Sequence, residues 1–164
     1  MSISRTATPC SGSSTKTSVT IDANVLLHAS DGQSPRHRTA RDLLERLAAG
    51  PGLVYVFWPV AMAYLRIATH PHVFEHPLDP AVARANLGDL LDRAHVRCPG
   101  EGSGFWQVYE DTVNDDVIRD NLVTDAHIAA LMRQHGVATI WTADRDFRRF
   151  ADVTARDSYA EATG

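Results

Sequence analysis

The sequence is poor in the features that mark secreted or membrane-bound proteins. Only two cysteines, Cys10 and Cys98, occur among its 164 residues, so neither a disulfide framework nor a thiolate metal site can be assembled. No apolar run approaches the roughly 20 residues that a membrane span needs. The first residues also lack the charged start and the continuous apolar stretch of a signal peptide. We therefore expect a soluble protein of the reducing cytoplasm.

An excess of positive charge is absent as well. The formal net charge is −4, and charged residues make up 22% of the chain, which excludes a uniformly basic surface but leaves room for a local basic groove that binds nucleic acid. The length suits one compact domain. Residues 1–17 are rich in Ser and Thr, so we expect a disordered N-terminal tail followed by a single domain over residues 18–164.

Short β-branched or apolar runs alternate with segments of helical spacing along the rest of the chain. The expected strands are 19–21, 54–57, 95–98 and 137–141, and the expected helices are 37–48, 59–67, 79–94, 105–113 and 125–135, with a loop between the first strand and the first helix. Residues 146–155 are expected to form a short turn or helix and an edge strand. This alternation predicts an α/β domain whose sheet is mainly parallel and covered on both faces.

Three aspartates far apart in sequence stand at the ends of runs that we interpret as strands. They are Asp22, Asp125 and Asp144. Because the carboxyl ends of parallel strands meet at one edge of an open sheet, we expect these side chains to lie close together. Such carboxylates would repel one another without a cation, and oxygen ligands suit Mg²⁺ or Mn²⁺. The pattern therefore predicts a divalent metal site.

Each aspartate alone has a simpler interpretation. Asp22 and Asp144 are typical turn residues after a strand. Asp125 stands where we expect the alanine-rich helix to begin, and an N-cap aspartate there would satisfy free backbone N–H groups. Only the conjunction of the three favours the metal site.

Four motifs, in order, resemble the PIN-domain toxins of the VapC family. They are Ile21-Asp-Ala-Asn24, Leu65-Arg-Ile-Ala-Thr-His-Pro71, Asn121-Leu-Val-Thr-Asp-Ala-His-Ile-Ala-Ala130 and Thr142-Ala-Asp-Arg-Asp-Phe147. The likeness spans roughly residues 18–155. It implies a PIN-like fold with three α/β/α layers and the activity of a metal-dependent endoribonuclease, the toxin half of a bacterial toxin–antitoxin pair.

The resemblance also implies the site and its chemistry. The metal ligands carry over to Asp22, Asp125 and Asp144, and Asp146 matches an acidic position whose part in metal binding varies among PIN domains. Water activated by Mg²⁺ or Mn²⁺ would hydrolyse an RNA phosphodiester bond. The implied partners are the RNA substrate, a small antitoxin that plugs the acidic site, and a second copy of the toxin in a homodimer.

Other positions support or disturb this assignment. Asn24 and Thr142 could hold a carboxylate or a bound water, and Arg66 could neutralise a phosphate or brace a carboxylate. PIN domains usually carry a Glu three residues before this arginine, where the sequence has Ala63. The missing carboxylate leaves an alternative open, namely a non-catalytic PIN module that binds an antitoxin or RNA.

Two further acidic residues and a competing enzyme class complete the alternatives. Asp42 and Glu45 are conceivable replacements for the missing Glu, although solvated positions on a helix face are the simpler interpretation. A Mg²⁺-dependent phosphatase would need Asp-x-Asp at the first strand, and the sequence has Asp22-Ala-Asn24 there. This reading is therefore disfavoured.

Overall fold

The computed structural model of the protein describes residues 17–160. The expected disordered tail, residues 1–17, lies outside the described residues except for Thr17. Every helix within the described part of the chain is too short or too polar to cross a membrane.

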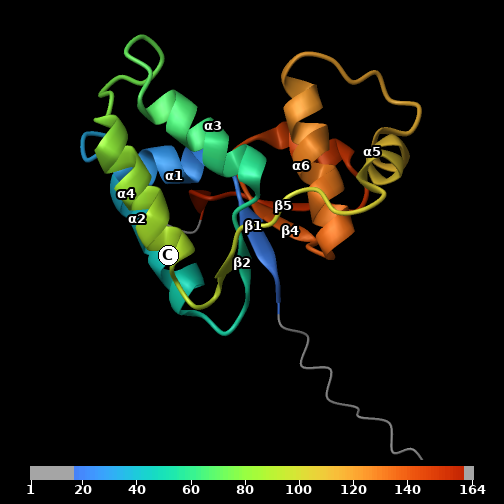
Figure 1. Ribbon diagram of the computed structural model, residues 1–164, viewed down its shortest axis with the longest axis horizontal. Coiled ribbons are helices and arrows are strands. Elements are labelled where there is room, and N and C mark those ends of the chain that lie inside the picture. Colours follow the sequence, from blue (N-terminus) through green and yellow to red (C-terminus); the bar gives the residue numbers. More distant parts are fainter. Residues whose placement is uncertain (1–16, 161–164) are drawn as a thin grey trace, which may run out of the picture.

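A five-stranded parallel sheet forms the centre of the molecule (Figure 1). Its strands are β1 (Val19–Ile21), β2 (Val54–Tyr55), β3 (Val96–Arg97), β4 (Thr139–Trp141) and β5 (Thr154–Arg156). They lie in the order β3-β2-β1-β4-β5, and every neighbouring pair is parallel. The chain therefore reverses its direction of travel across the sheet between β1 and β4. In open α/β sheets, ligands bind at such a reversal, outside the carboxyl ends of the strands.

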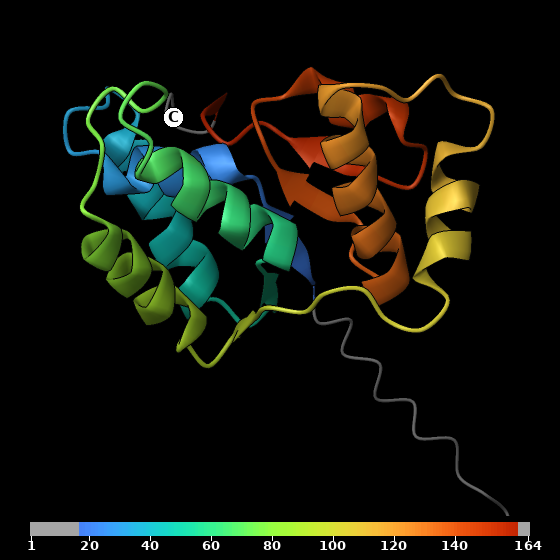
Figure 2. The same cartoon turned by 45° about the horizontal axis from the view of Figure 1, so that its top comes forward.

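Helices cover both sides of the sheet. They are α1 (Ala23–Ser30), α2 (His37–Ala49), α3 (Trp58–Ala68), α4 (Pro80–Leu91), α5 (Phe105–Val113) and α6 (Asn121–His135), followed by the 3₁₀ helix η1 (Arg145–Arg149). Figures 1 and 2 show α1 to α4 on one side and α5 and α6 on the other. Right-handed crossovers give this arrangement, because the path from β1 to β3 and the return to β4 run in opposite directions. The predicted α/β architecture with a parallel sheet is confirmed.

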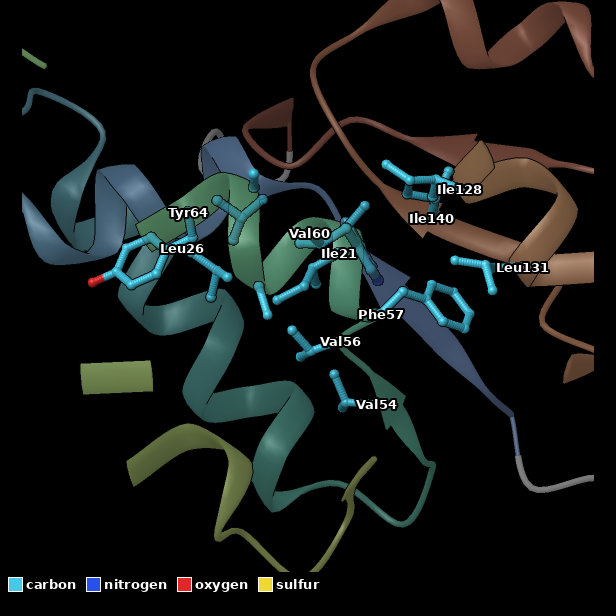
Figure 3. Packing of buried hydrophobic residues seen from close by; sticks show 14 of the residues in the cluster. Ile21, Leu26, Val54, Val56, Phe57, Val60, Tyr64, Ile128, Leu131 and Ile140 are labelled. Atoms are coloured by element: carbon cyan, nitrogen blue, oxygen red, sulfur yellow. The ribbon is translucent and has the colours of Figure 1, made fainter. Parts of the chain in front are cut away.

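Alternating residues of one segment pack on opposite faces of the sheet. Val54 and Val56 face the side of α1 and α3, whereas Phe57 lies toward Leu131 of α6 (Figure 3). The rings of Phe57 and His135 lie 5.7 Å apart. A strand buried on both faces reads as a continuous apolar run, which explains why its sequence shows no alternation.

Two expectations about helices were wrong. Residues 23–30 form α1 rather than a loop, since Val25, Leu26 and Leu27 are buried against the core. Helix α6 begins at Asn121, so Asp125 stands neither at a strand end nor at an N-cap. The β-branched residues before Asp125 cost a helix only a few tenths of a kcal/mol, and burial of the following helical face outweighs that cost.

Candidate metal centre

The turn after β1 presents Asp22 at the reversal point of the sheet. Asp22 occupies the N-cap position of α1, yet its side chain makes no capping hydrogen bond to the described helix. Its Oδ2 instead accepts a hydrogen bond from Thr142 Oγ1 at 2.8 Å and a longer one from Asn24 Nδ2 at 3.4 Å. The carboxylate is thus oriented toward the end of β4.

Thr142, which follows β4, fixes two acidic segments at once. Its side chain is buried at 3% exposure. A hydroxyl has one proton to donate, and here it goes to Asp22, while the same Oγ1 accepts from the backbone N–H of Asp144 at 3.0 Å. The Thr142 N–H donates to Arg156 O at 2.9 Å, which ties this turn to β5.

Three carboxylates converge beside this turn. Asp144 precedes η1 and caps it, because its Oδ1 accepts from the Asp146 N–H at 2.8 Å. Asp125 approaches from α6. Asp125, Asp144 and Asp146 each offer a carboxylate oxygen, and these atoms all lie within 4.8 Å of one another. Oxygen donors gathered at this spacing suit one hard divalent cation.

The electrostatics link all four aspartates. The pKa of Asp125 is raised to about 6, mainly by burial and then, in order of size, by the negative charges of Asp144, Asp22 and Asp146. Like charges at a shared site disfavour ionisation, whereas a bound cation reverses this effect. The donor set therefore fits a divalent metal ion.

Three of the four predicted metal ligands lie close together, and the fourth lies to one side of them. Asp125, Asp144 and Asp146 form the group within 4.8 Å. Asp22 lies beside this group but does not belong to it. It is connected to the group through Thr142, and its negative charge contributes to the raised pKa of Asp125. Asp146, which by resemblance matches a position whose part in metal binding varies among PIN domains, is a full member of the group in this geometry.

The other predicted residues lie farther from the group or play another part. Arg66 is exposed in the last turn of α3 and makes no ion pair with the described residues, and Ala63 is half-buried one turn earlier. Glu45 forms a two-bond ion pair with Arg93, at 3.0 and 3.1 Å. Neither Glu45 nor the exposed Asp42 joins the carboxylate group found among residues 17–160.

The segment after β5 received no role from the sequence. Its Tyr159 lies close enough to Asp22 that this carboxylate, after burial, contributes to raising the tyrosine pKa to about 12. Asp22 and Tyr159 are far apart in the chain, and no local pattern marks Tyr159. The proximity of Tyr159 to Asp22 becomes visible only in the structure, where the segment after β5 crosses the edge of the sheet.

Comparison with known proteins gives a consistent picture. The profile of the PIN domain family matches residues 19–153. The chain is 51% identical over 143 residues to Ribonuclease VapC48 of Mycobacterium tuberculosis, covering 87% of this chain and 99% of the relative. It is 34% identical over 133 residues to Ribonuclease VapC31 of the same organism, covering 81% and 93%.

Two solved structures share the fold. One is Mycobacterium tuberculosis VapC20, a Sarcin-Ricin loop cleaving toxin, with a TM-score of 0.59 and 22% identity over 82% of this chain and 98% of that one. The other is VapBC2 from Rickettsia felis bound to a DNA fragment from its promoter, with a TM-score of 0.62 and 14% identity over 85% and 97%. At these identities the likeness concerns the fold alone.

Proposed function

This chain belongs to the PIN domain family, and we propose that it is the endoribonuclease toxin of a toxin–antitoxin system, hydrolysing RNA phosphodiester bonds with a divalent metal ion. The 51% identity to a protein named as a ribonuclease supports the activity. The observation that carries the proposal is the carboxylate group of Asp125, Asp144 and Asp146 at the reversal point of the sheet, with Asp22 held beside it by Thr142.

We assign the metal, Mg²⁺ or Mn²⁺, to the oxygens of Asp125, Asp144 and Asp146. Asp22 is the fourth carboxylate of the site. Thr142 and Asn24 both donate to its Oδ2, which leaves Oδ1 for the cation or for a water. A cation held here supplies charge that lowers the pKa of water and stabilises the phosphorane-like transition state. Thr142 and Asn24 keep the Asp22 carboxylate oriented without adding a charge of their own.

The first test is cleavage by the purified, antitoxin-free protein. Total RNA is incubated with it in Mg²⁺, in Mn²⁺ or in EDTA, beside Asp22→Asn and a charge-matched control, Asp92→Asn, whose exposed side chain lies at the end of α4. We expect new 5′ ends that require both metal and Asp22 and that the control retains. Cleavage by Asp22→Asn at the wild-type rate would refute the assignment.

Ala63 supports the second candidate, a non-catalytic PIN module that binds an antitoxin or RNA. The side chain at this position offers no ligand to a metal, and no other acidic side chain among the described residues joins the group. Folded wild-type protein that cuts no RNA across the metal series would favour this module. Circular dichroism of the same samples establishes that the protein is folded.

An antitoxin is the proposed protein partner, and a groove between α2 and α4 supports its binding. The groove has a volume of about 360 Å³, and its lining includes the apolar Leu26, Leu44 and Leu87 together with the basic Arg41 and Arg93 and the acidic Glu45 and Asp89. An apolar strip bordered by charges of both signs fits the apolar face of an amphipathic helix. Hydrogen exchange of the co-expressed pair tests this placement, because α2 and α4 should gain protection on binding.

We also propose that residues 18–164 form one PIN domain that assembles as a homodimer. Trp106 of α5 is 70% exposed and stacks on Tyr109 of the same helix, with ring centroids 5.6 Å apart. Large exposed apolar side chains commonly mark contact surfaces. Sedimentation equilibrium of the wild type and of Trp106→Asp tests the dimer, and the variant should shift toward the monomer. A single cooperative unfolding transition would support one domain.

A further inference from the structure

The chain after β5 crosses the carboxyl edge of the sheet to reach α1. β5 is the outermost strand beyond β4, whereas Tyr159 packs against His28 of α1, with ring centroids 5.6 Å apart at 84°. Ser158, which lies between β5 and Tyr159 in the chain, is buried at 4% exposure. Figure 2 shows this dark red segment turning from the sheet toward α1. The segment therefore forms a wall on the α1 side of the carboxylate site.

The guanidinium group of Arg36 lies over the aromatic ring of Tyr159. The guanidinium carbon of Arg36 lies 4.4 Å from the ring centroid. Arg36 is exposed at the start of α2, and its guanidinium forms no ion pair with a carboxylate of residues 17–160. A guanidinium supported on an aromatic ring keeps its N–H groups available at its edge, where they match the two oxygens of a phosphate.

The Arg36–Tyr159 pair lies on the α1 side of the site, because Tyr159 packs against His28 of α1 and this helix begins directly after Asp22. Burial is the main cause that raises the pKa of Tyr159 to about 12, and the negative charge of Asp22 acts in the same direction, whereas the positive charge of Arg36 opposes it. The Tyr159 hydroxyl is buried, and a hydrogen bond from the Arg36 side chain also opposes the rise in its pKa. The ring is thus a fixed support between Asp22 and Arg36, and the guanidinium is the part exposed to solvent.

We propose that Arg36, supported by Tyr159, binds a backbone phosphate of the RNA adjacent to the bond that is cut, on the Asp22 side of the carboxylate site. This inference rests on the proposed ribonuclease function. The four aspartates of the site repel RNA. A chain of net charge −4 therefore needs local cationic side chains to bind the RNA backbone. Arg36 is the binding residue, and Tyr159 and His28 are positioning residues.

Steady-state cleavage of a defined RNA tests the role of Arg36. We compare wild type with Arg36→Ala, Arg36→Lys, Tyr159→Leu and Arg84→Ala, the last being an exposed arginine of α4 that removes one charge away from the site. For Arg36→Ala we expect about a tenfold rise in KM, little change in kcat, and a salt dependence of binding that is weaker by about one phosphate contact. Arg36→Lys should restore the salt dependence but only part of the affinity.

Two further measurements separate the possible failures. Binding of the same RNA to the full-length protein in EDTA, followed by fluorescence anisotropy, reports on Arg36 even if no cleavage occurs. The Arg36→Ala and Tyr159→Leu effects should also be less than additive in the double variant, because both remove one interaction. If Arg36→Ala matches Arg84→Ala in KM, anisotropy and salt dependence, the inference is wrong. If wild type binds through Arg36 but cuts nothing, only the proposed function fails.

Discussion

Thr142 donates a 2.8 Å hydrogen bond to Asp22 although 120 positions separate the two residues in the chain. The bond joins the turn after β4 to the turn after β1, at the point where the strand order reverses. Because the same hydroxyl accepts from the Asp144 N–H, one neutral side chain positions two carboxylates of the site. Loss of a group that orients a metal ligand in this way typically lowers metal affinity or activity by about 10- to 100-fold.

Replacing Thr142 with Val should therefore weaken metal binding with little change in shape. The hydroxyl is lost, and Asp22 and the Asp144 N–H lose their shared partner. We expect a fall of about 10- to 100-fold in Mn²⁺ affinity or in cleavage rate, measured by titration calorimetry and by the RNA assay. Thr142→Ser keeps the hydroxyl and should recover most of the loss. Equal defects in both variants would mean that the methyl group, not the hydrogen bond, is what matters.

Much of the fold follows from the sequence because its strands are short, apolar and bounded by clear turns. The rule that the carboxyl ends of parallel strands gather at one edge was enough to predict that the residues after β1 and β4 lie close together. Helix α1 escaped prediction because its buried run, Val25 to Leu27, is too short to establish a helical period. The first turn of α6 escaped because Val123 and Thr124 favour a strand locally, and tertiary packing overrides that preference.

The site was predictable to the same degree. Asp22 and Asp144 follow from their positions after β1 and β4, whereas the approach of Asp125 depends on how α6 packs against the sheet. Sequence alone cannot place a helix to within a few ångströms of a strand end. Tyr159 shows the limit most clearly, since its contact with His28 arises from a chain path that no local pattern encodes.

Two glycines of the chain should respond in opposite directions to substitution by alanine. Gly136 ends α6 at a φ of +69°, where a Cβ costs roughly 1–2 kcal/mol. Gly88 lies inside α4 with nothing within 4 Å of an added Cβ, so alanine there should stabilise by about 0.5–1 kcal/mol. Urea unfolding of both variants measures the two effects. A stabilising Gly136→Ala would contradict the left-handed end of α6.

Gln134 of α6 holds the glycine-rich loop of residues 100–104 against this helix. Its Oε1 accepts from the Gly102 N–H at 2.7 Å, and its Nε2 donates to Ser103 O at 3.2 Å. Gln134→Ala should cost about 1–2 kcal/mol of unfolding free energy, because it removes both bonds. Gln107→Ala is the matched control. Among the described residues the exposed Gln107 side chain donates only to Asp111, one turn along α5, and its loss should cost about 0.3 kcal/mol. Equal costs would show that the loop is held by other contacts.

The burial of Asp125 and the repulsion from its neighbouring carboxylates predict how the metal-free protein responds to pH. Asp125 has a pKa of about 6 in the folded protein against an ordinary value of 3.8. A carboxyl whose pKa is raised by folding contributes stability that is complete below its ordinary pKa and is lost as the pH rises through the folded value. In EDTA, the free energy of unfolding should therefore decrease, through Asp125, as the pH rises from about 4 to about 7.

Urea unfolding of wild type and Asp125→Asn in EDTA across this range measures that decrease. The stability of wild type relative to the variant should fall with rising pH by about 1 kcal/mol, a figure reduced for solvent screening of this half-buried group. Mn²⁺ at about 100 times its dissociation constant should then add about 2.7 kcal/mol to wild type at pH 7, because the cation replaces repulsion by attraction, and much less to Asp125→Asn. A pH-independent difference between the two proteins would show that Asp125 is neither desolvated nor held near the other carboxylates.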